Sequence, residues 1–195
     1  QANSDFIQIQ DDYFARCTYI DNVGSTFYLY TNIDAPNYRL VKMDLSSPIQ
    51  ANWEDVIPES EHVLLVNAGG GKFFANYLID AKSAVKQFDQ NGQLEREVNL
   101  PGIGTARGFG AKKKDKTLYY TFTSFTDPNT IYKYDIATGE STLYQQAEVD
   151  FDPAAYETKQ VFYASKDGTK VPMFITHKKD LELNGKNPTY LYAYG

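Results

Sequence analysis

Short runs of apolar and aromatic residues, separated by turn residues, follow one another along the first 150 residues. In many of these runs apolar and polar positions alternate, which is the two-residue period of a half-buried β-strand. Tyrosine and phenylalanine, which favour strands, are frequent: the chain has 16 Tyr and 12 Phe. Long leucine and alanine periodicity of the helical kind is missing. The pattern therefore predicts a protein that is mainly β.

The strand pattern repeats with a period of 45 to 46 residues. Aromatic runs that begin at Thr26, Lys72 and Thr117 are spaced 46 and 45 positions apart. The aspartates that close the next runs repeat with spacings of 45 and 46 and are Asp44, Asp89 and Asp135. A period of about 40 to 50 residues among strands is typical of β-propeller blades, each of which is a four-stranded antiparallel sheet.

The repeat predicts three such blades within residues 12–148. The predicted strands are 15–21, 25–31, 39–44 and 54–57 in the first blade, 62–68, 72–79, 85–88 and 94–99 in the second, and 105–110, 117–124, 130–135 and 141–145 in the third. Phe6–Gln10 also alternates, which predicts the outer strand of a preceding blade within residues 1–11. Because propellers close with about four to eight blades, we expect a fragment whose exposed strand edges promote self-association.

A different organisation is expected after the third blade. The acidic segment at 149–155 lacks strand periodicity and is interpreted as a linker. The runs 160–164 and 170–177 flank an Asp-Gly pair, which predicts a β-hairpin with a type I′ turn. Pro172 has no N–H to donate, so its strand is expected at an edge or with the proline in an unpaired position. A tyrosine-rich run at 189–194 predicts a third strand.

Composition narrows the classes of partner. The formal net charge is −6 and the sequence pI about 4.9, so the chain has no basic footprint for nucleic acid or an anionic lipid surface. No apolar run reaches the roughly 20 residues that a membrane helix needs. Cys17 is the single cysteine, so no internal disulfide can form. The compartment, cytoplasmic or periplasmic, stays open.

Several isolated features are better explained by structure than by chemistry. Gly69-Gly70-Gly71-Lys72 lacks the Walker pattern and joins two strands, so a hairpin is expected in place of a phosphate site. Cys17 suits a buried strand position. His62 and His177 lack further ligands at metal-binding spacing, so no metal or other cofactor is expected. Lys112-Lys113-Lys114 is interpreted as a solvated hairpin tip.

Longer strings resemble the prolyl oligopeptidase family of serine peptidases. Thr31–Leu45 and Tyr120–Asp135 resemble later blades of that family's seven-bladed propeller. Tyr156–Gly195, with VFYASKDGTKVPMFITHKK and TYLYAYG, resembles the first strands of its α/β-hydrolase domain. The resemblance implies that residues 156–195 begin the catalytic domain and that the Tyr194 hydroxyl stabilises the oxyanion of the tetrahedral intermediate. Ala193 replaces the family's usual glycine, and Gly195 is the only glycine present of its Gly-Gly pair.

The resemblance implies a serine endopeptidase that hydrolyses short peptides after proline, with the propeller filtering access. The chain has no Gly-x-Ser-x-Gly motif, and in the family the serine, aspartate and histidine of the triad would follow Gly195. We therefore expect the 195-residue chain alone to be inactive. Two alternatives remain open: an oligopeptidase of the same family that cleaves after basic residues, and a non-catalytic propeller that binds a protein or carbohydrate.

Overall fold

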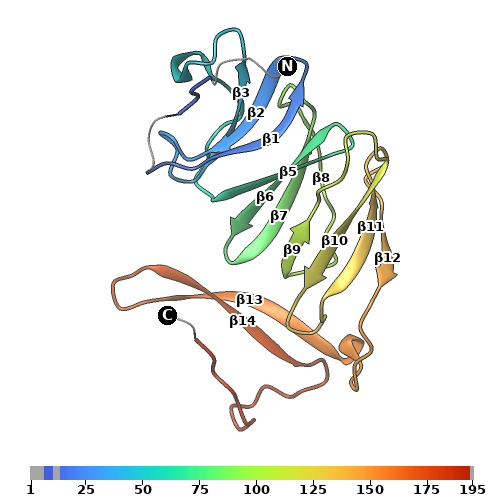
Figure 1. The fold of residues 1–195 in the computed structure, drawn as a ribbon. Helices are drawn as coiled ribbons and strands as arrows, with labels where there is room; N and C mark the ends of the chain where they lie inside the picture. Colours follow the sequence, from blue (N-terminus) through green and yellow to red (C-terminus); the bar gives the residue numbers. More distant parts are fainter. Residues whose placement is uncertain (1–6, 11–13, 194–195) are drawn as a thin grey trace. The chain divides into compact units, whose positions relative to one another are not determined.

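Antiparallel strands make up nearly all the regular structure of the computed structural model, which describes residues 7–10 and 14–193 (Figure 1). The chain divides into two compact units, Gln1–Ala147 and Glu148–Gly195. In the described part, two 3-10 turns are the only helical segments, η1 (Gln50–Asn52) and η2 (Pro153–Ala155). No helix of this part has the length and apolar character needed to cross a bilayer.

The first unit contains three four-stranded sheets, each built from strands that are consecutive in sequence. The first sheet consists of β1 (Cys17–Val23), β2 (Thr26–Thr31), β3 (Arg39–Asp44) and β4 (Glu54–Ile57). The second consists of β5 (Leu64–Gly69), β6 (Lys72–Ile79), β7 (Lys82–Phe88) and β8 (Leu94–Glu97). The third consists of β9 (Thr105–Gly108), β10 (Thr117–Thr123), β11 (Thr130–Asp135) and β12 (Ser141–Gln145). The three predicted four-stranded sheets are thus confirmed.

The second sheet lies between the other two, as the series of sheets in Figure 1 shows. Phe73 and Phe74 are neighbours on β6, and strand alternation points them to opposite faces. Both are fully buried, because the first sheet covers Phe73 and the third covers Phe74. A strand covered on both faces explains why Phe73, Phe74 and Ala75 follow one another without an intervening polar residue.

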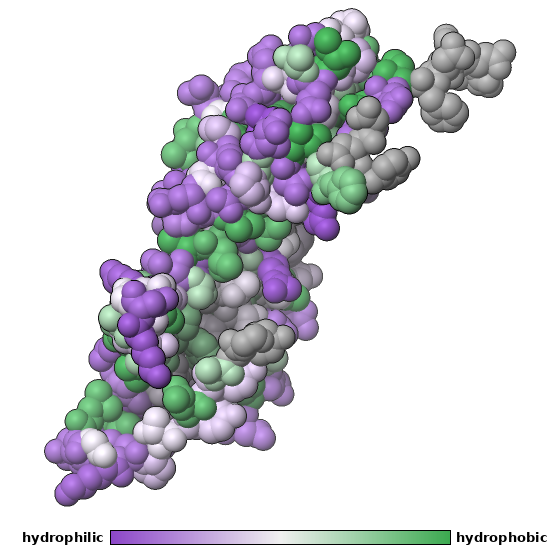
Figure 2. Space-filling view, turned by 90° about the vertical axis from the view of Figure 1, so that its left-hand side faces the viewer, coloured by the Kyte–Doolittle hydropathy of each residue, from purple (hydrophilic) through white to green (hydrophobic). Residues whose placement is uncertain are grey.

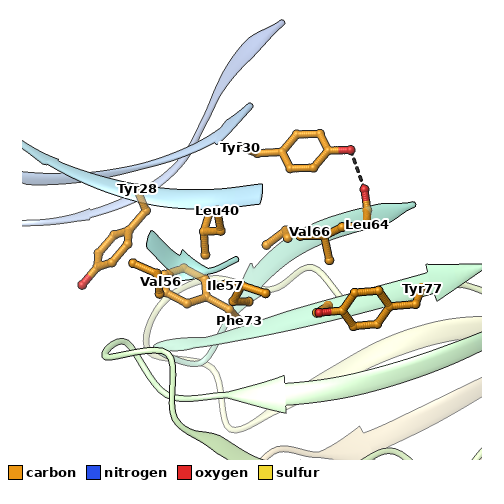
Figure 3. Packing of buried hydrophobic residues seen from close by; sticks show 10 residues of the cluster. Tyr28, Tyr30, Leu40, Val56, Ile57, Leu64, Val66, Phe73 and Tyr77 are labelled. Atoms are coloured by element: carbon orange, nitrogen blue, oxygen red, sulfur yellow. Dashed lines mark hydrogen bonds between the residues drawn. The ribbon is translucent and has the colours of Figure 1, made fainter. Parts of the chain in front are cut away.

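Aromatic and aliphatic side chains fill the space between the first two sheets (Figure 3). Tyr28 packs its ring 4.8 Å from that of Phe73. The Tyr30 hydroxyl donates a hydrogen bond to the backbone oxygen of Leu64 at 2.6 Å, across the interface. The buried members of this cluster are Tyr28, Tyr30, Leu40, Val56, Ile57, Leu64, Val66, Phe73, Ala75 and Tyr77.

A buried hydrogen-bond network joins the second and third sheets. Tyr134 and Gln87 are both fully buried, and the Tyr134 hydroxyl donates to Gln87 Oε1 at 2.8 Å. The Gln87 amide nitrogen donates to Glu95 Oε2 at 2.8 Å and to the Ile136 oxygen at 3.0 Å. Every polar atom of the buried amide therefore has a partner, as a polar group inside an apolar interface requires.

Several strand ends differ from their predicted positions, among them both ends of β1, the start of β5 and the end of β8. At the start of β7 and the end of β9 the reason is a positive φ. Asp80 and Ala81, with φ of 48° and 62°, form a two-residue turn, so β7 begins at Lys82 instead of at 85. Gly108 and Phe109 have φ of 109° and 68°, which ends β9 before the predicted residue 110. The Phe109 ring stacks on Tyr120 at 4.6 Å and is buried, and this packing offsets the cost of its backbone conformation.

The outer face of the first sheet carries a third cluster, in which Leu29, Val41 and Met43 are buried. Ile9 packs against this cluster, although residues 7–10 form no strand in the structure. The remainder of the predicted outer strand at 1–11 falls largely outside the described residues. Whether this segment pairs with a preceding blade stays a prediction.

The second unit contains a two-stranded antiparallel sheet of β13 (Tyr156–Ala164) and β14 (Lys170–Lys178). Asp152 caps η2 just before β13 by accepting the Ala154 N–H at 2.9 Å. Taken over whole residues, none of its described residues is buried. A lone hairpin is at best marginally stable in water, so this unit is expected to need further contacts.

Candidate functional site

Tyr194, the predicted oxyanion-stabilising residue, lies outside the described residues. The described part of the predicted third strand, residues 189–193, has no strand structure, because no described strand pairs with it. Tyr190 and Tyr192 stack with ring centroids 6.4 Å apart and are 86% and 70% exposed. Alternation along the predicted strand would place Tyr192 in a core, whereas the structure leaves it exposed because the strand does not form.

The predicted hairpin is present, but its turn is of another type. Gly168 N–H donates to the Ser165 oxygen at 2.9 Å, and only Gly168 of the Asp-Gly pair has positive φ, at 85°. A type I′ turn would need positive φ at both residues, whereas a type I turn followed by a left-handed glycine needs one. Hydrogen bonds from the Ser165 hydroxyl and the Thr169 N–H lower the pKa of Asp167 to about 2.

Pro172 occupies a position that fits its missing N–H. Ser165 N–H donates to the Thr169 oxygen at 2.8 Å, so alternation along the ladder makes the Pro172–Phe162 pair a non-hydrogen-bonded one. The prediction of an edge strand with an unpaired proline is confirmed for the described residues, because both strands of this sheet are edges.

His177 faces Glu157 across the same hairpin. Its Nε2 lies 3.4 Å from Glu157 Oε1, and its side chain is 7% exposed. His177 Nδ1 lies 2.8 Å from the Lys178 backbone oxygen. A carbonyl oxygen can only accept, so a hydrogen bond here requires the tautomer with the proton on Nδ1. The Lys159 ammonium, which donates to Glu157 at 3.0 Å, lowers the pKa of the Glu157 carboxyl. The group is a contact between the two strands of the hairpin.

In the first unit, a cavity of about 210 Å³ lies between β1, β5 and the loop that joins β9 to β10. Asp21 of β1 ion-pairs at 3.2 Å with Lys113, from the loop between β9 and β10. The Lys113 ammonium also donates to the Asn22 backbone oxygen. The register of β1 shifts between Tyr19 and Asp21, which marks a β-bulge. The cavity lining consists of Tyr19, Ile20, Asp21, Val66, Asn67, Ala68, Gly69, Gly71, Ala111 and Lys113.

Sequence reasoning missed this group. Asp21 and Lys113 stand 92 positions apart, and neither belongs to a recognisable motif. The lysine run was expected to be a solvated hairpin tip, but Lys113 joins the third sheet to the first. The bulge places the aspartate, and a bulge leaves no clear signal in a single sequence.

The other candidates of the sequence have structural roles. Gly70 and Gly71, with φ of 59° and 72°, form the tight turn between β5 and β6 that was predicted in place of a phosphate site. Burial raises the pKa of the Cys17 thiol, which packs beside the outer cluster of the first sheet. His62 Nε2 lies 3.6 Å from Glu61 Oε1. Within residues 7–10 and 14–193, no three His, Cys, Asp or Glu side chains gather as metal ligands.

Comparison with known proteins agrees with the arrangement of sheets. The family model described as "Prolyl oligopeptidase, N-terminal beta-propeller domain" matches residues 1–147. A prolyl endopeptidase of Elizabethkingia meningoseptica is 50% identical over 192 residues, which cover 98% of this chain and 27% of the relative. The chain thus spans about a quarter of that relative's length.

Solved structures extend the comparison to three dimensions. A prolyl endopeptidase structure aligns with a TM-score of 0.79 and 39% identity, over 92% of this chain and 27% of the other. Prolyl oligopeptidase B from Galerina marginata aligns with a TM-score of 0.79 and 31% identity, over 90% of this chain and 26% of the other. With its strand repeat, its three four-stranded sheets and these similarities, the chain belongs to the prolyl oligopeptidase family, whose N-terminal β-propeller domain accounts for residues 1–147.

Proposed function

We propose that this chain is part of a serine endopeptidase that hydrolyses short peptides on the carboxyl side of proline. The observation that carries the proposal is the 50% identity, over nearly the whole chain, to a protein named prolyl endopeptidase. In this proposal the three sheets belong to a seven-bladed propeller that restricts access of large substrates. Residues 149–155 form the linker, and residues 156–195 begin an α/β-hydrolase domain.

The proposed role of Tyr194 is to donate its hydroxyl to the negative charge that develops on the substrate carbonyl oxygen. A donor aimed at that oxygen stabilises the transition state more than the bound substrate, so its loss lowers kcat. The support is the TYLYAYG string, in which Tyr194 matches the family's tyrosine. The nucleophile and general base would come from the remaining part of a protein as long as the relatives.

The experiment compares the whole protein that contains this chain with its Tyr194→Phe variant, using a reporter peptide with proline before the scissile bond. Loss of one oxyanion donor is expected to lower kcat by about 10²- to 10³-fold with little change in KM. The matched control is Tyr192→Phe, because Tyr192 is 70% exposed. Its kcat should differ from that of the wild type by less than about twofold. Equal activity of the Tyr194→Phe protein would remove Tyr194 from the mechanism.

A second candidate is an oligopeptidase that cleaves after basic residues. Oligopeptidase B from Trypanosoma brucei aligns with a TM-score of 0.77 but 23% identity, which reflects the shared fold alone. The higher identity to prolyl endopeptidases favours proline. A whole protein that cleaves an arginine reporter faster than a proline reporter would reverse the assignment, and one that cleaves neither would favour the non-catalytic binding propeller.

We also infer that the 195-residue chain associates with copies of itself when it is alone. Apolar residues, green in Figure 2, come to the surface in separate patches on the displayed face. On the third sheet, Tyr119 and Tyr144 pack ring to ring at 4.8 Å yet stay 44% and 61% exposed. Such a face is suited to a second sheet of the same kind. Sedimentation velocity over a range of protein concentrations tests this inference. A chain that stays monomeric at every concentration would overturn it.

A further inference from the structure

The inner edge of β5, the edge that does not pair with β6, has a short gap in its backbone hydrogen bonds. The hairpin pairs Gly69 with Lys72, and the Val63 oxygen accepts from Leu78 N–H on the β6 side. Backbone groups alternate between the two edges of a strand. The N–H and C=O groups of Leu64, Val66 and Ala68 therefore point away from β6.

Three of these six inner-edge groups have partners, and the three consecutive groups between them do not. Leu64 N–H donates to the Asn37 oxygen at 2.9 Å, and the Leu64 oxygen accepts from the Tyr30 hydroxyl. The Ala68 oxygen accepts from Ala111 N–H at 3.1 Å. Among the described residues, no partner is present for Val66 N–H, Val66 C=O and Ala68 N–H. The gap thus offers a donor, an acceptor and a donor in sequence.

The chain itself shows that this edge accepts extended backbone. The loop that follows β9 lies along the next positions of the edge, where Ala111 N–H bonds to the Ala68 oxygen and Gly70 N–H bonds to the Lys112 oxygen at 3.1 Å. The loop therefore continues the sheet for two hydrogen bonds and stops next to the open Ala68 N–H. An added segment of extended chain is the natural complement of such an edge.

Space for such a segment exists beside the gap. Val66, Asn67 and Ala68 line the cavity of about 210 Å³. Its charged walls, Asp21 and Lys113, are paired with each other, so the cavity offers no uncompensated charge to select a charged side chain. The complementarity is therefore to peptide backbone, which presents C=O, N–H and C=O along one edge over three residues.

We propose that the inner edge of β5 at Val66–Ala68 is a binding site for an extended peptide backbone, which adds a short strand beside β5 without regard to side-chain sequence. The peptide nature of the ligand rests on the proposed function. The site is separate from Tyr194 and performs no chemistry. It would hold a peptide against the propeller wall through three hydrogen bonds, to Val66 N–H, Val66 C=O and Ala68 N–H.

The test uses the ¹⁵N-labelled whole protein that contains this chain and acetyl-Ala-Ala-N-methylamide, a neutral peptide with one complete set of complementary groups. We expect chemical-shift changes at the Val66 and Ala68 amides and a Kd on the order of 1 mM. At ten times Kd, hydrogen exchange of both amides should slow about tenfold, because protection follows the bound fraction. An unchanged spectrum at about 20 mM peptide would mean that the edge holds only water and would overturn the proposal.

Two controls separate the backbone contact from other binding. The analogue methylated on the nitrogen of the second alanine lacks the N–H that meets Val66 C=O, so its binding should be at least about tenfold weaker. Lys114→Gln, at an exposed position of the same loop that does not line the cavity, should change the Kd of the neutral peptide by less than about twofold. Equal binding of the methylated analogue, or a tenfold loss in the variant, would refute edge addition. Since no hydrolysis is measured, the peptidase proposal is unaffected by either result.

Discussion

The buried pair of Tyr134 and Gln87 is expected to be a major polar contribution to the contact between the second and third sheets. Tyr134→Phe keeps the ring and removes the hydroxyl that donates to Gln87 Oε1 at 2.8 Å. Because Gln87 is fully buried, water cannot replace the lost donor. A buried acceptor left without a partner costs about 1–3 kcal/mol, and we expect the free energy of unfolding to fall by that amount.

Gln87→Leu should cost more, since it removes the partner of several groups at once. The Tyr134 hydroxyl and the Ile136 oxygen both lose their contact with the amide, as does Glu95 Oε2. We expect a loss of about 2–5 kcal/mol. The double variant should be less destabilised than the sum of the two, by about 1–2 kcal/mol, because both single changes break the same hydrogen bond.

Urea unfolding followed by tyrosine fluorescence measures these free energies, provided that the m-value stays constant among the variants. Tyr120→Phe is the matched control, because the Tyr120 hydroxyl donates at 3.0 Å to Ser141, which is only partly buried. The free energy of unfolding should fall by less than about 1 kcal/mol in Tyr120→Phe. A Tyr134→Phe protein as stable as the wild type, or strictly additive variants, would refute the role given to this pair.

Three further predictions concern single positions. Gly92→Ala should lower Tm far more than Gly24→Ala, because a Cβ at Gly92 would stand 2.0 Å from a backbone oxygen of the first sheet, whereas Gly24 has nothing within 4 Å; equal shifts in a thermal melt would contradict this. Burial raises the pKa of Tyr30 to about 12 from 10.0, so its contribution to stability is complete below pH 10 and lost as the pH rises through 12; Tyr30→Phe should flatten that alkaline loss. Ser165→Ala should raise the pKa of Asp167 from about 2 toward 3.8 in an NMR titration, and an unchanged value would count against the hydroxyl contact.

The blades could be predicted from the sequence because their signals are local. Alternation, turn residues and the recurring aspartates depend only on neighbouring positions. The turn at Asp80 and Ala81 was missed, since alanine seldom adopts a φ of 62°. In the hairpin of the second unit, the Asp-Gly pair identified the turn but not its type, because both turn types accept that pair.

The candidate sites were less accessible to sequence reasoning. The predicted role of Tyr194 came from resemblance alone, since a tyrosine in a tyrosine-rich run has no distinctive physical signal. Asp21 and Lys113 meet only because the loop between β9 and β10 reaches β1 of the first sheet, and the gap at Val66 depends on which neighbours reach one edge. Such contacts are properties of the packed sheets, which a pattern of apolar and polar positions does not encode.

Phe73 and Phe74 are adjacent on β6 but pack against different sheets. Two neighbouring residues therefore contribute to two separate interfaces. Each sheet is therefore stabilised by its contacts with the neighbouring sheet, as in a linear array of coupled units. Shortening Phe73 should loosen the first sheet, and shortening Phe74 the third. The outer sheet that has lost its phenylalanine contact would unfold first, and the middle sheet would unfold last.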